Sequence, residues 1–160
     1  MEDKSQSTEE QVIREYPNRT FWLEGKKLSG MGNLILTNKR LIFLNLVALE
    51  ESQMKEAQQL LKENDLNKTI QHAIKLHKKN FQIPLSSITR VRMEMYKIFP
   101  FPRLCMRIRY LKNGNPIDIG FWFRIPLLMG FKELEITLVA GWIYAVKNAS
   151  EREKLPNLTK

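Results

Sequence analysis

The strongest constraint in this sequence is an Asn113-Gly114 pair that stands between two runs of alternating apolar residues. Asn and Gly tolerate the positive φ angles of a two-residue β-hairpin turn better than other residues, so the pair predicts a hairpin and its register. In that register every pair on one face is apolar: Tyr110 with Ile117, Ile108 with Ile119, Met106 with Phe121, and Leu104 with Phe123. A shift by one residue would destroy this agreement, so the chain is expected to contain a sheet with one apolar face.

The opposite face of the same hairpin is expected to be basic. Arg107 and Arg109 point to this face, where Cys105 stands opposite Trp122. In residues 88–95, charged residues alternate with Val91, Met93 and Met95, which predicts another strand with one buried and one solvated face. If that strand lies beside the hairpin, five arginines surround Trp122, and we call this set the arginine surface: Arg90, Arg92, Arg107, Arg109 and Arg124.

The remaining segments predict further strands and one helical insertion. Short apolar-rich runs at residues 20–24, 33–37, 40–44 and 81–85 are typical of strands. Residues 47–80 change to Glu, Gln, Lys, Leu and Ala with apolar residues at helical spacing, which predicts helices inserted between the third and fourth strands. We expect residues 1–18 to form a flexible or short helical lead-in, residues 19–150 the domain, and residues 151–160 a tail.

Residues 131–149 have the length and composition of a C-terminal helix that is apolar on two sides. One stripe, which includes Trp142, is expected to close the sandwich. The second stripe is expected to bury the inserted helices, a partner or a membrane, and its members are Ile136, Val139, Ile143 and Val146.

Two segments in this order of elements resemble a known family. The sequence LTNKRLIF at residues 36–43 and the sequence IPLSSI at residues 83–88, with the last hairpin and the Trp-containing helix, resemble GRAM and related bacterial pleckstrin-homology-like (PH-like) domains. The resemblance implies a mainly β (α+β) fold, a seven-stranded bent β-sandwich or partly open barrel that a C-terminal helix caps. It also implies a platform that binds lipid or protein. The chain departs from phosphoinositide-binding members because Lys39 and Arg40 are adjacent and therefore point to opposite faces of a strand.

Composition narrows the class of function. The 160 residues suit one domain, and the formal net charge of +9 favours anionic partners such as membrane headgroups or nucleic acid. The single cysteine, Cys105, excludes an intramolecular disulfide, and its ordinary interpretation is an inert strand residue, with an activated thiol as the alternative. His72 and His77 would point about 140° apart on a helix, so they are not expected to share a metal. Without a recognisable catalytic motif, we expect a non-enzymatic protein that needs neither cofactor nor metal.

The leading hypothesis is a peripheral, cytoplasmic module that docks to anionic phospholipid at the inner face of a membrane through the arginine surface. Its alternative is a plain solvated face, partly neutralised by Glu94 and Asp118. A second candidate is an apolar loop with a basic rim, made of Lys97, Phe99, Phe101 and Arg103, which suits shallow membrane insertion unless its phenylalanines fold back onto the sandwich. A protein-interaction or homo-oligomerisation domain is the main alternative function. Nucleic-acid binding ranks third because the chain lacks a recognisable motif for it.

Overall fold

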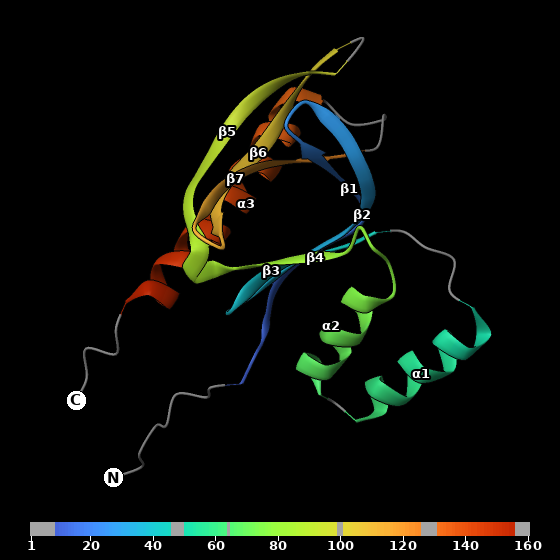
Figure 1. Cartoon of the computed structure of the whole chain (residues 1–160). Coiled ribbons are helices and arrows are strands. Elements are labelled where there is room, and N and C mark those ends of the chain that lie inside the picture. Colours follow the sequence, from blue (N-terminus) through green and yellow to red (C-terminus); the bar gives the residue numbers. More distant parts are fainter. Residues whose placement is uncertain (1–8, 46–49, 64, 99–100, 126–130, 156–160) are drawn as a thin grey trace.

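The computed structural model describes residues 9–45, 50–63, 65–98, 101–125 and 131–155 (Figure 1). Seven strands form one antiparallel sheet in the order β4-β3-β2-β1-β7-β6-β5. In chain order the elements are β1 (Val12–Glu24), β2 (Lys27–Thr37), β3 (Arg40–Asn45), α1 (Glu51–Lys62), α2 (Leu66–Lys75), β4 (Phe81–Pro84), the 3-10 turn η1 (Leu85–Ser87), β5 (Ile88–Ile98), β6 (Phe101–Lys112), β7 (Asn115–Phe123) and α3 (Phe131–Lys154). The predicted architecture is confirmed: the chain has a mainly β fold of seven strands, with a C-terminal helix on the sheet and a helical insertion between β3 and β4.

The β6–β7 hairpin has the register that the Asn-Gly pair predicts. Met106 lies opposite Phe121, Ile108 opposite Ile119, and Tyr110 opposite Ile117. Both turn residues have positive φ, 51° at Asn113 and 79° at Gly114, which is the turn geometry that this pair favours. The sheet bends around a core to which both halves contribute (Figure 1).

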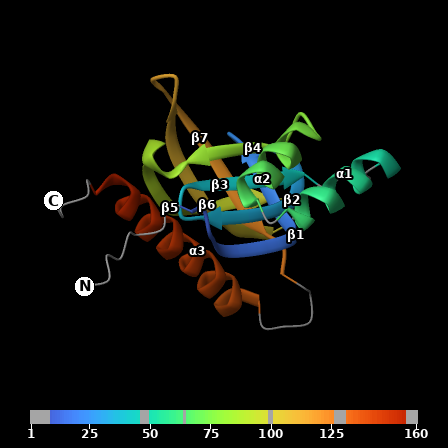
Figure 2. The same cartoon turned by 90° about the horizontal axis from the view of Figure 1, so that it is seen from below.

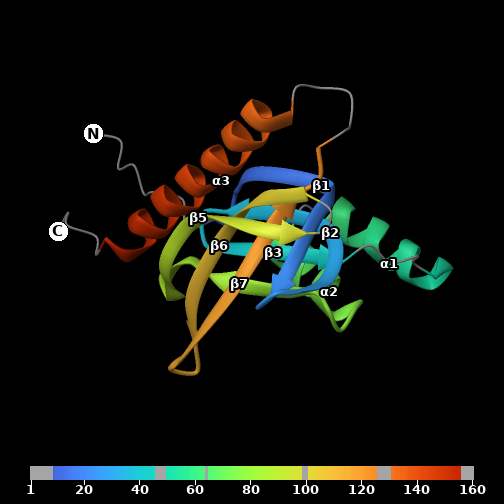
Figure 3. The same ribbon diagram turned by 90° about the horizontal axis from the view of Figure 1, so that it is seen from above.

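Helix α3 lies against the β5–β7 side of the sheet, while α1 and α2 project from the other side of the molecule (Figures 2 and 3). The side chain of Trp142 is fully buried and stacks on Phe123 of β7, with ring centroids 5.5 Å apart. Among the described residues, no helix is both long enough and apolar enough to cross a bilayer.

Both ends of the domain differ from the prediction. Strand β1 begins at Val12, so residues 12–18 belong to the sheet and are not a short helix or a flexible lead-in. The register of β1 with β2 shifts between Tyr16 and Thr20, and Pro17 lies within that irregular stretch, where its missing N–H costs no ladder bond. At the other end, α3 continues to Lys154, so the first residues of the expected tail are helical. Residues 1–8 and 156–160 lie outside the described part.

Strand β5 also corrects one prediction. Val91, Met93 and Met95 all point to the core side, where they stand opposite Ile108, Met106 and Leu104 of β6. Only Val91 is buried, because exposure rises from 6% at Val91 to 38% at Met93 and 67% at Met95. The alternation therefore predicted correctly that these three residues share the core side of the sheet. It did not predict that Met93 and Met95 are exposed, which follows from the position of β5 at the edge of the sheet.

Candidate functional site

Three connections meet at one end of the sheet around a cavity of about 560 Å³. They are the β1–β2 turn, the segment between α2 and β4, and the β6–β7 turn. Four lysines and one glutamate line this cavity, and we call it the lysine pocket: Lys27, Lys78, Lys79, Lys112 and Glu24. All five side chains belong to exposed residues, so the pocket is an open, positively charged mouth.

Local geometry positions Lys27 and Lys79. Gly25 has a φ of 59°, which allows the β1–β2 turn to close and places Lys27 at the start of β2. Lys79 lies across the mouth, because its Nζ donates to the backbone carbonyl of Ser29 at 2.6 Å. Its own backbone N–H donates to Nδ1 of His77 at 3.1 Å, so His77 shapes this loop.

The floor of the lysine pocket is aromatic and apolar. Trp22 and Phe81 pack edge to face with centroids 5.0 Å apart, and Tyr110 closes the wall. Burial raises the pKa of Tyr110, and the nearby Glu24 carboxylate raises it further. Tyr110 therefore remains a neutral hydroxyl at physiological pH and can donate a hydrogen bond to an anion in the pocket.

Sequence reasoning did not find this pocket. Lys78 and Lys79 lie within the predicted insertion at residues 47–80, and Lys112 directly precedes the predicted Asn113-Gly114 turn, so nothing in the linear pattern joined these lysines to Lys27. A detectable signal was present, because lysines follow or precede each of three strand connections. Only the order of strands shows that the three connections lie at the same end of the sheet.

The arginine surface is largely occupied by carboxylates. Asp118 pairs with three arginines: its Oδ1 lies 2.8 Å from Nε of Arg107, and its Oδ2 lies 3.4 Å from Arg92 and 3.1 Å from Arg109. Glu94 adds a contact of 3.1 Å to Arg92. The guanidinium groups that could clasp a phosphate already hold carboxylates, which matches the plain alternative of a partly neutralised face.

Arg107 is a correction within this surface, because the residue is buried at 8% exposure. Its Nη1 donates to the carbonyl of Gly25 at 2.9 Å, so it ties β6 to the β1–β2 turn. A residue held in this way supports the fold and does not present its charge to a membrane. Arg90, Arg109 and Arg124 are exposed residues, and of these three only Arg109 pairs with Asp118 among the described residues.

Trp122 is half-buried, and its ring contacts two side chains. Phe21 stacks on one side at 4.7 Å, and the Arg103 guanidinium lies 5.8 Å from its ring centroid. It also packs against a small cluster of Leu23, Tyr96 and Cys105. Trp122 is therefore part of the packing of the outer face and is not a free membrane anchor.

The predicted membrane loop falls partly outside the described residues. Residues 99–100 and the side chain of Phe101 belong to the part that is not described, so the Phe99 and Phe101 prediction is untested. Lys97 is exposed, while Arg103 is half-buried against Trp122.

The predicted partner stripe of α3 needs correction. Val139 and Val146 have no exposed surface and pack in the main core, so they cannot contact a partner. Ile136 is 47% exposed, and Ile143 is half-buried. The apolar residues of the helix follow two stripes so evenly that the sequence could not tell which one faces the sheet.

The cysteine and histidines take ordinary structural roles. Cys105 is buried, and burial with the nearby Glu135 carboxylate raises its pKa to about 12, so its thiol is not activated. His72 Nδ1 lies 3.4 Å from Glu56 of α1, whereas His77 belongs to the loop after α2. In the described part of the chain, His, Cys, Asp and Glu side chains form no group of three that could hold a metal ion.

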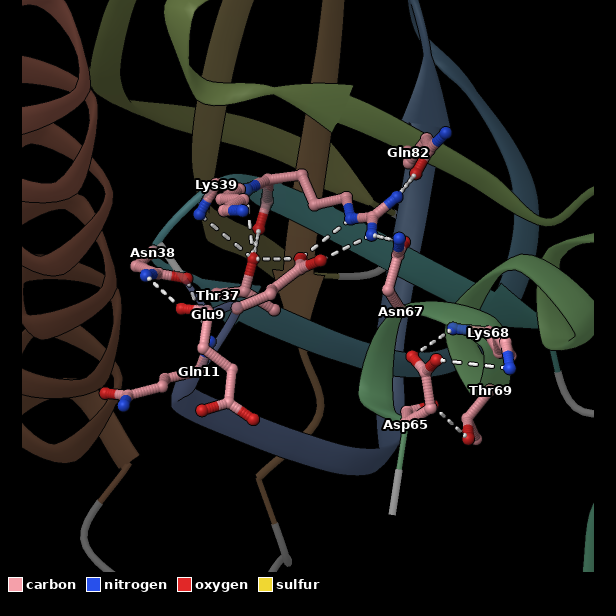
Figure 4. A network of polar contacts seen from close by, with 12 residues as sticks. Glu9, Gln11, Thr37, Asn38, Lys39, Asp65, Asn67, Lys68, Thr69 and Gln82 are labelled. Carbon is pink, nitrogen blue, oxygen red and sulfur yellow. Dashed lines mark hydrogen bonds and ion pairs between the residues drawn. The ribbon is translucent and has the colours of Figure 1, made fainter. Parts of the chain in front are cut away.

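A separate polar network attaches the insertion to the sheet (Figure 4). Arg40 of β3 forms a two-point ion pair with Glu10, and its Nη1 and Nη2 donate to Gln82 of β4 and Asn67 of α2. Thr37 donates to the same carboxylate at 2.7 Å. Burial alone would raise the pKa of Glu10, but the hydrogen bonds from Arg40 and Thr37 outweigh it and hold the pKa below its usual value. Arg40 is therefore structural and unavailable to a ligand.

Comparisons with known proteins give one distant likeness. No protein-family model matches this chain, and no curated protein matches it. Among solved structures, the chain is similar to the Vps36 N-terminal PH domain, with a TM-score of 0.48 and 15% identity over 89% of this chain and 80% of that one. A likeness of this degree says nothing about a ligand, so the functional argument rests on the residues alone.

Proposed function

We propose that this protein is a non-enzymatic binding module that docks to anionic phospholipid surfaces through the lysine pocket. The sequence suggested the arginine surface as the docking site. We propose the lysine pocket in its place because carboxylates already pair with three of those arginines. The observation that carries the proposal is the convergence of four lysines from three connections on one open cavity with an aromatic floor.

The surroundings of the pocket suit a membrane surface. Leu28 at the rim is 44% exposed, and Leu111, which precedes Lys112, is 46% exposed. Exposed apolar side chains next to lysines allow shallow insertion while the ammonium groups contact headgroup phosphates. Each lysine near an anionic leaflet contributes about 1 kcal/mol, so four lysines are sufficient for reversible attachment.

The test is co-sedimentation with neutral and with anionic vesicles, comparing wild type with the double variant Lys78→Gln, Lys112→Gln. Neither of these side chains makes a hydrogen bond or ion pair among the described residues, so the fold should be retained. Loss of two lysines should weaken binding to anionic vesicles roughly 30-fold, at about 1 kcal/mol each.

The matched control is Lys55→Gln, Lys62→Gln on α1, which removes the same charge from exposed residues that do not line the pocket. It should bind within about twofold of wild type if the pocket, and not the net charge, is responsible. Equal losses in the two double variants would show that charge alone drives binding. No binding of wild type to anionic vesicles would refute the proposal.

A further inference from the structure

The sheet has two edges, and the structure protects them very differently. The edge strand β4 has only four residues and ends at Pro84, which cannot donate to a ladder. The edge strand β5 has 11 residues, and in the described part of the chain only β6 pairs with it. An unpaired strand edge is a template for another strand, so a long one needs a covering element.

The middle of β5 lacks the usual protective features. A register shift lies between Ile88 and Arg90, and Lys97 lies near the other end. Between them, residues 91–96 pair with β6 without irregularity. The outer edge of this stretch therefore presents a regular row of backbone donors and acceptors.

Apolar side chains accompany this open edge. Met93 and Met95 point to the core side of the sheet, yet they are 38% and 67% exposed. A groove of about 780 Å³ separates the start of β5 from α3, and Met93 and Tyr144 are among its lining residues. Tyr144 is 70% exposed, so an apolar surface continues from the helix to the strand.

We propose that the outer edge of β5 pairs with β5 of a second copy of this chain, antiparallel and centred on Met93. In a symmetric antiparallel pair, paired residues point to the same face, so one residue must stand opposite its own copy. With Met93 at that centre, Arg92 stands opposite Glu94 twice, and Val91 stands opposite Met95 twice. In this register, each charged side chain therefore faces one of opposite charge, and each of these apolar side chains faces another apolar side chain.

Other centres are less complementary. Centring on Arg92 or Glu94 places that charge opposite its own copy, and centring on Val91 places Arg90 opposite Arg92. Centring on Met95 brings no opposite charges together. Like charges directly opposite each other destabilise a strand pair, so the charge pattern of β5 selects Met93 as the centre.

The same register covers the exposed methionines. The twofold axis places the start of one β5 beside the end of the other, so the groove lining of the second copy, with its Tyr144, comes toward Met95. Strand pairing over about seven residues buries less than the roughly 1,200–2,000 Å² of a standard stable interface. We therefore expect a reversible dimer whose dissociation constant lies in the micromolar range.

The decisive experiment compares two single cysteine variants under mild oxidation. In the Met93→Cys variant, the two thiols lie directly opposite each other at a separation that a disulfide can span, so a covalent dimer should form. In the Met95→Cys variant, the two thiols lie roughly 14 Å apart along the strands and should not join, although position 95 is more exposed. Wild type is the negative control and should form no covalent dimer, because its cysteine, Cys105, is buried.

Sedimentation velocity provides the second measurement. Wild type should dimerise reversibly as its concentration rises, and Met95→Glu should weaken dimerisation at least tenfold. Leu28→Glu, which changes another exposed apolar residue far along the chain from β5, should dimerise as wild type does. A chain that stays monomeric at ~100 µM, or cross-linking as efficient through Met95→Cys as through Met93→Cys, would overturn the proposal.

Discussion

Removal of the Glu10 carboxylate should destabilise the protein more than its position at the edge of the described chain suggests. The Glu10 side chain is 4% exposed, and that of its partner Arg40 is 13% exposed. The variant Glu10→Ala leaves a nearly buried guanidinium with only Gln82 and Asn67 as partners and removes one of the two acceptors of the Thr37 hydroxyl. Loss of one partner from a buried ion pair costs about 3–5 kcal/mol.

The lower end of that range applies here, because an open cavity of about 750 Å³ borders the network and admits water. We therefore expect a loss of about 3 kcal/mol, which for a chain of this size lowers Tm by roughly 6–12 °C. Thermal unfolding followed by circular dichroism measures the shift. The control is Glu15→Ala, an exposed glutamate in β1.

The same pair predicts the direction of an acid effect. The pKa of Glu10 is lower in the folded state than in the unfolded chain, so the folded state binds its proton less readily. This contribution to stability is fully present above the unfolded pKa of about 4.5 and is lost as pH falls through the lower folded value. Glu10→Gln should remove this part of the acid dependence. If Glu10→Ala shifts Tm no more than Glu15→Ala does, the argument for a buried ion pair is refuted.

Two further predictions concern the core of the sheet. Gly32→Ala should lower the free energy of unfolding by more than about 3 kcal/mol, because the new Cβ would lie 1.9 Å from the backbone oxygen of Leu44. Denaturant unfolding measures this loss, and a loss under about 1 kcal/mol would contradict the close packing at Gly32. The thiol of Cys105, with a pKa of about 12, should resist alkylation at pH 8 in the native protein and react when the protein unfolds; native labelling as fast as that of a free thiol would contradict its burial.

Local patterns predicted the β6–β7 hairpin because its determinants are neighbours in the chain. A positive φ at Asn113 and Gly114 and alternating apolar residues are sufficient to specify both turn and register. The helical insertion was also visible, because a change of composition and period is a local signal. The start of β1 was missed because its residues become a strand only by pairing with β2, and their register with β2 is irregular between Tyr16 and Thr20.

The candidate site shows the same division. The strand register places Arg90, Arg92, Arg107 and Arg109 on one face. The number of arginines that each carboxylate neutralises depends on three strands at once, because Asp118 of β7 contacts arginines on both β5 and β6. The lysine pocket could not be predicted in this way, since Lys27, Lys78 and Lys112 are far apart in the chain. These lysines come together only because the order of strands places their three connections at the same end of the sheet.

The sequence by itself determined the kind of element at most positions, the faces that β5, β6 and β7 turn to the core, and the mainly β class of the fold. These follow from the backbone preferences and hydrophobic period of short segments. Only the tertiary structure decided which faces are covered: Val139 and Val146 of α3 are buried in the main core, whereas Met93 and Met95 of β5 remain exposed. Burial depends on what lies across from a residue, and a strand has no means of specifying locally that it is the last one in its sheet.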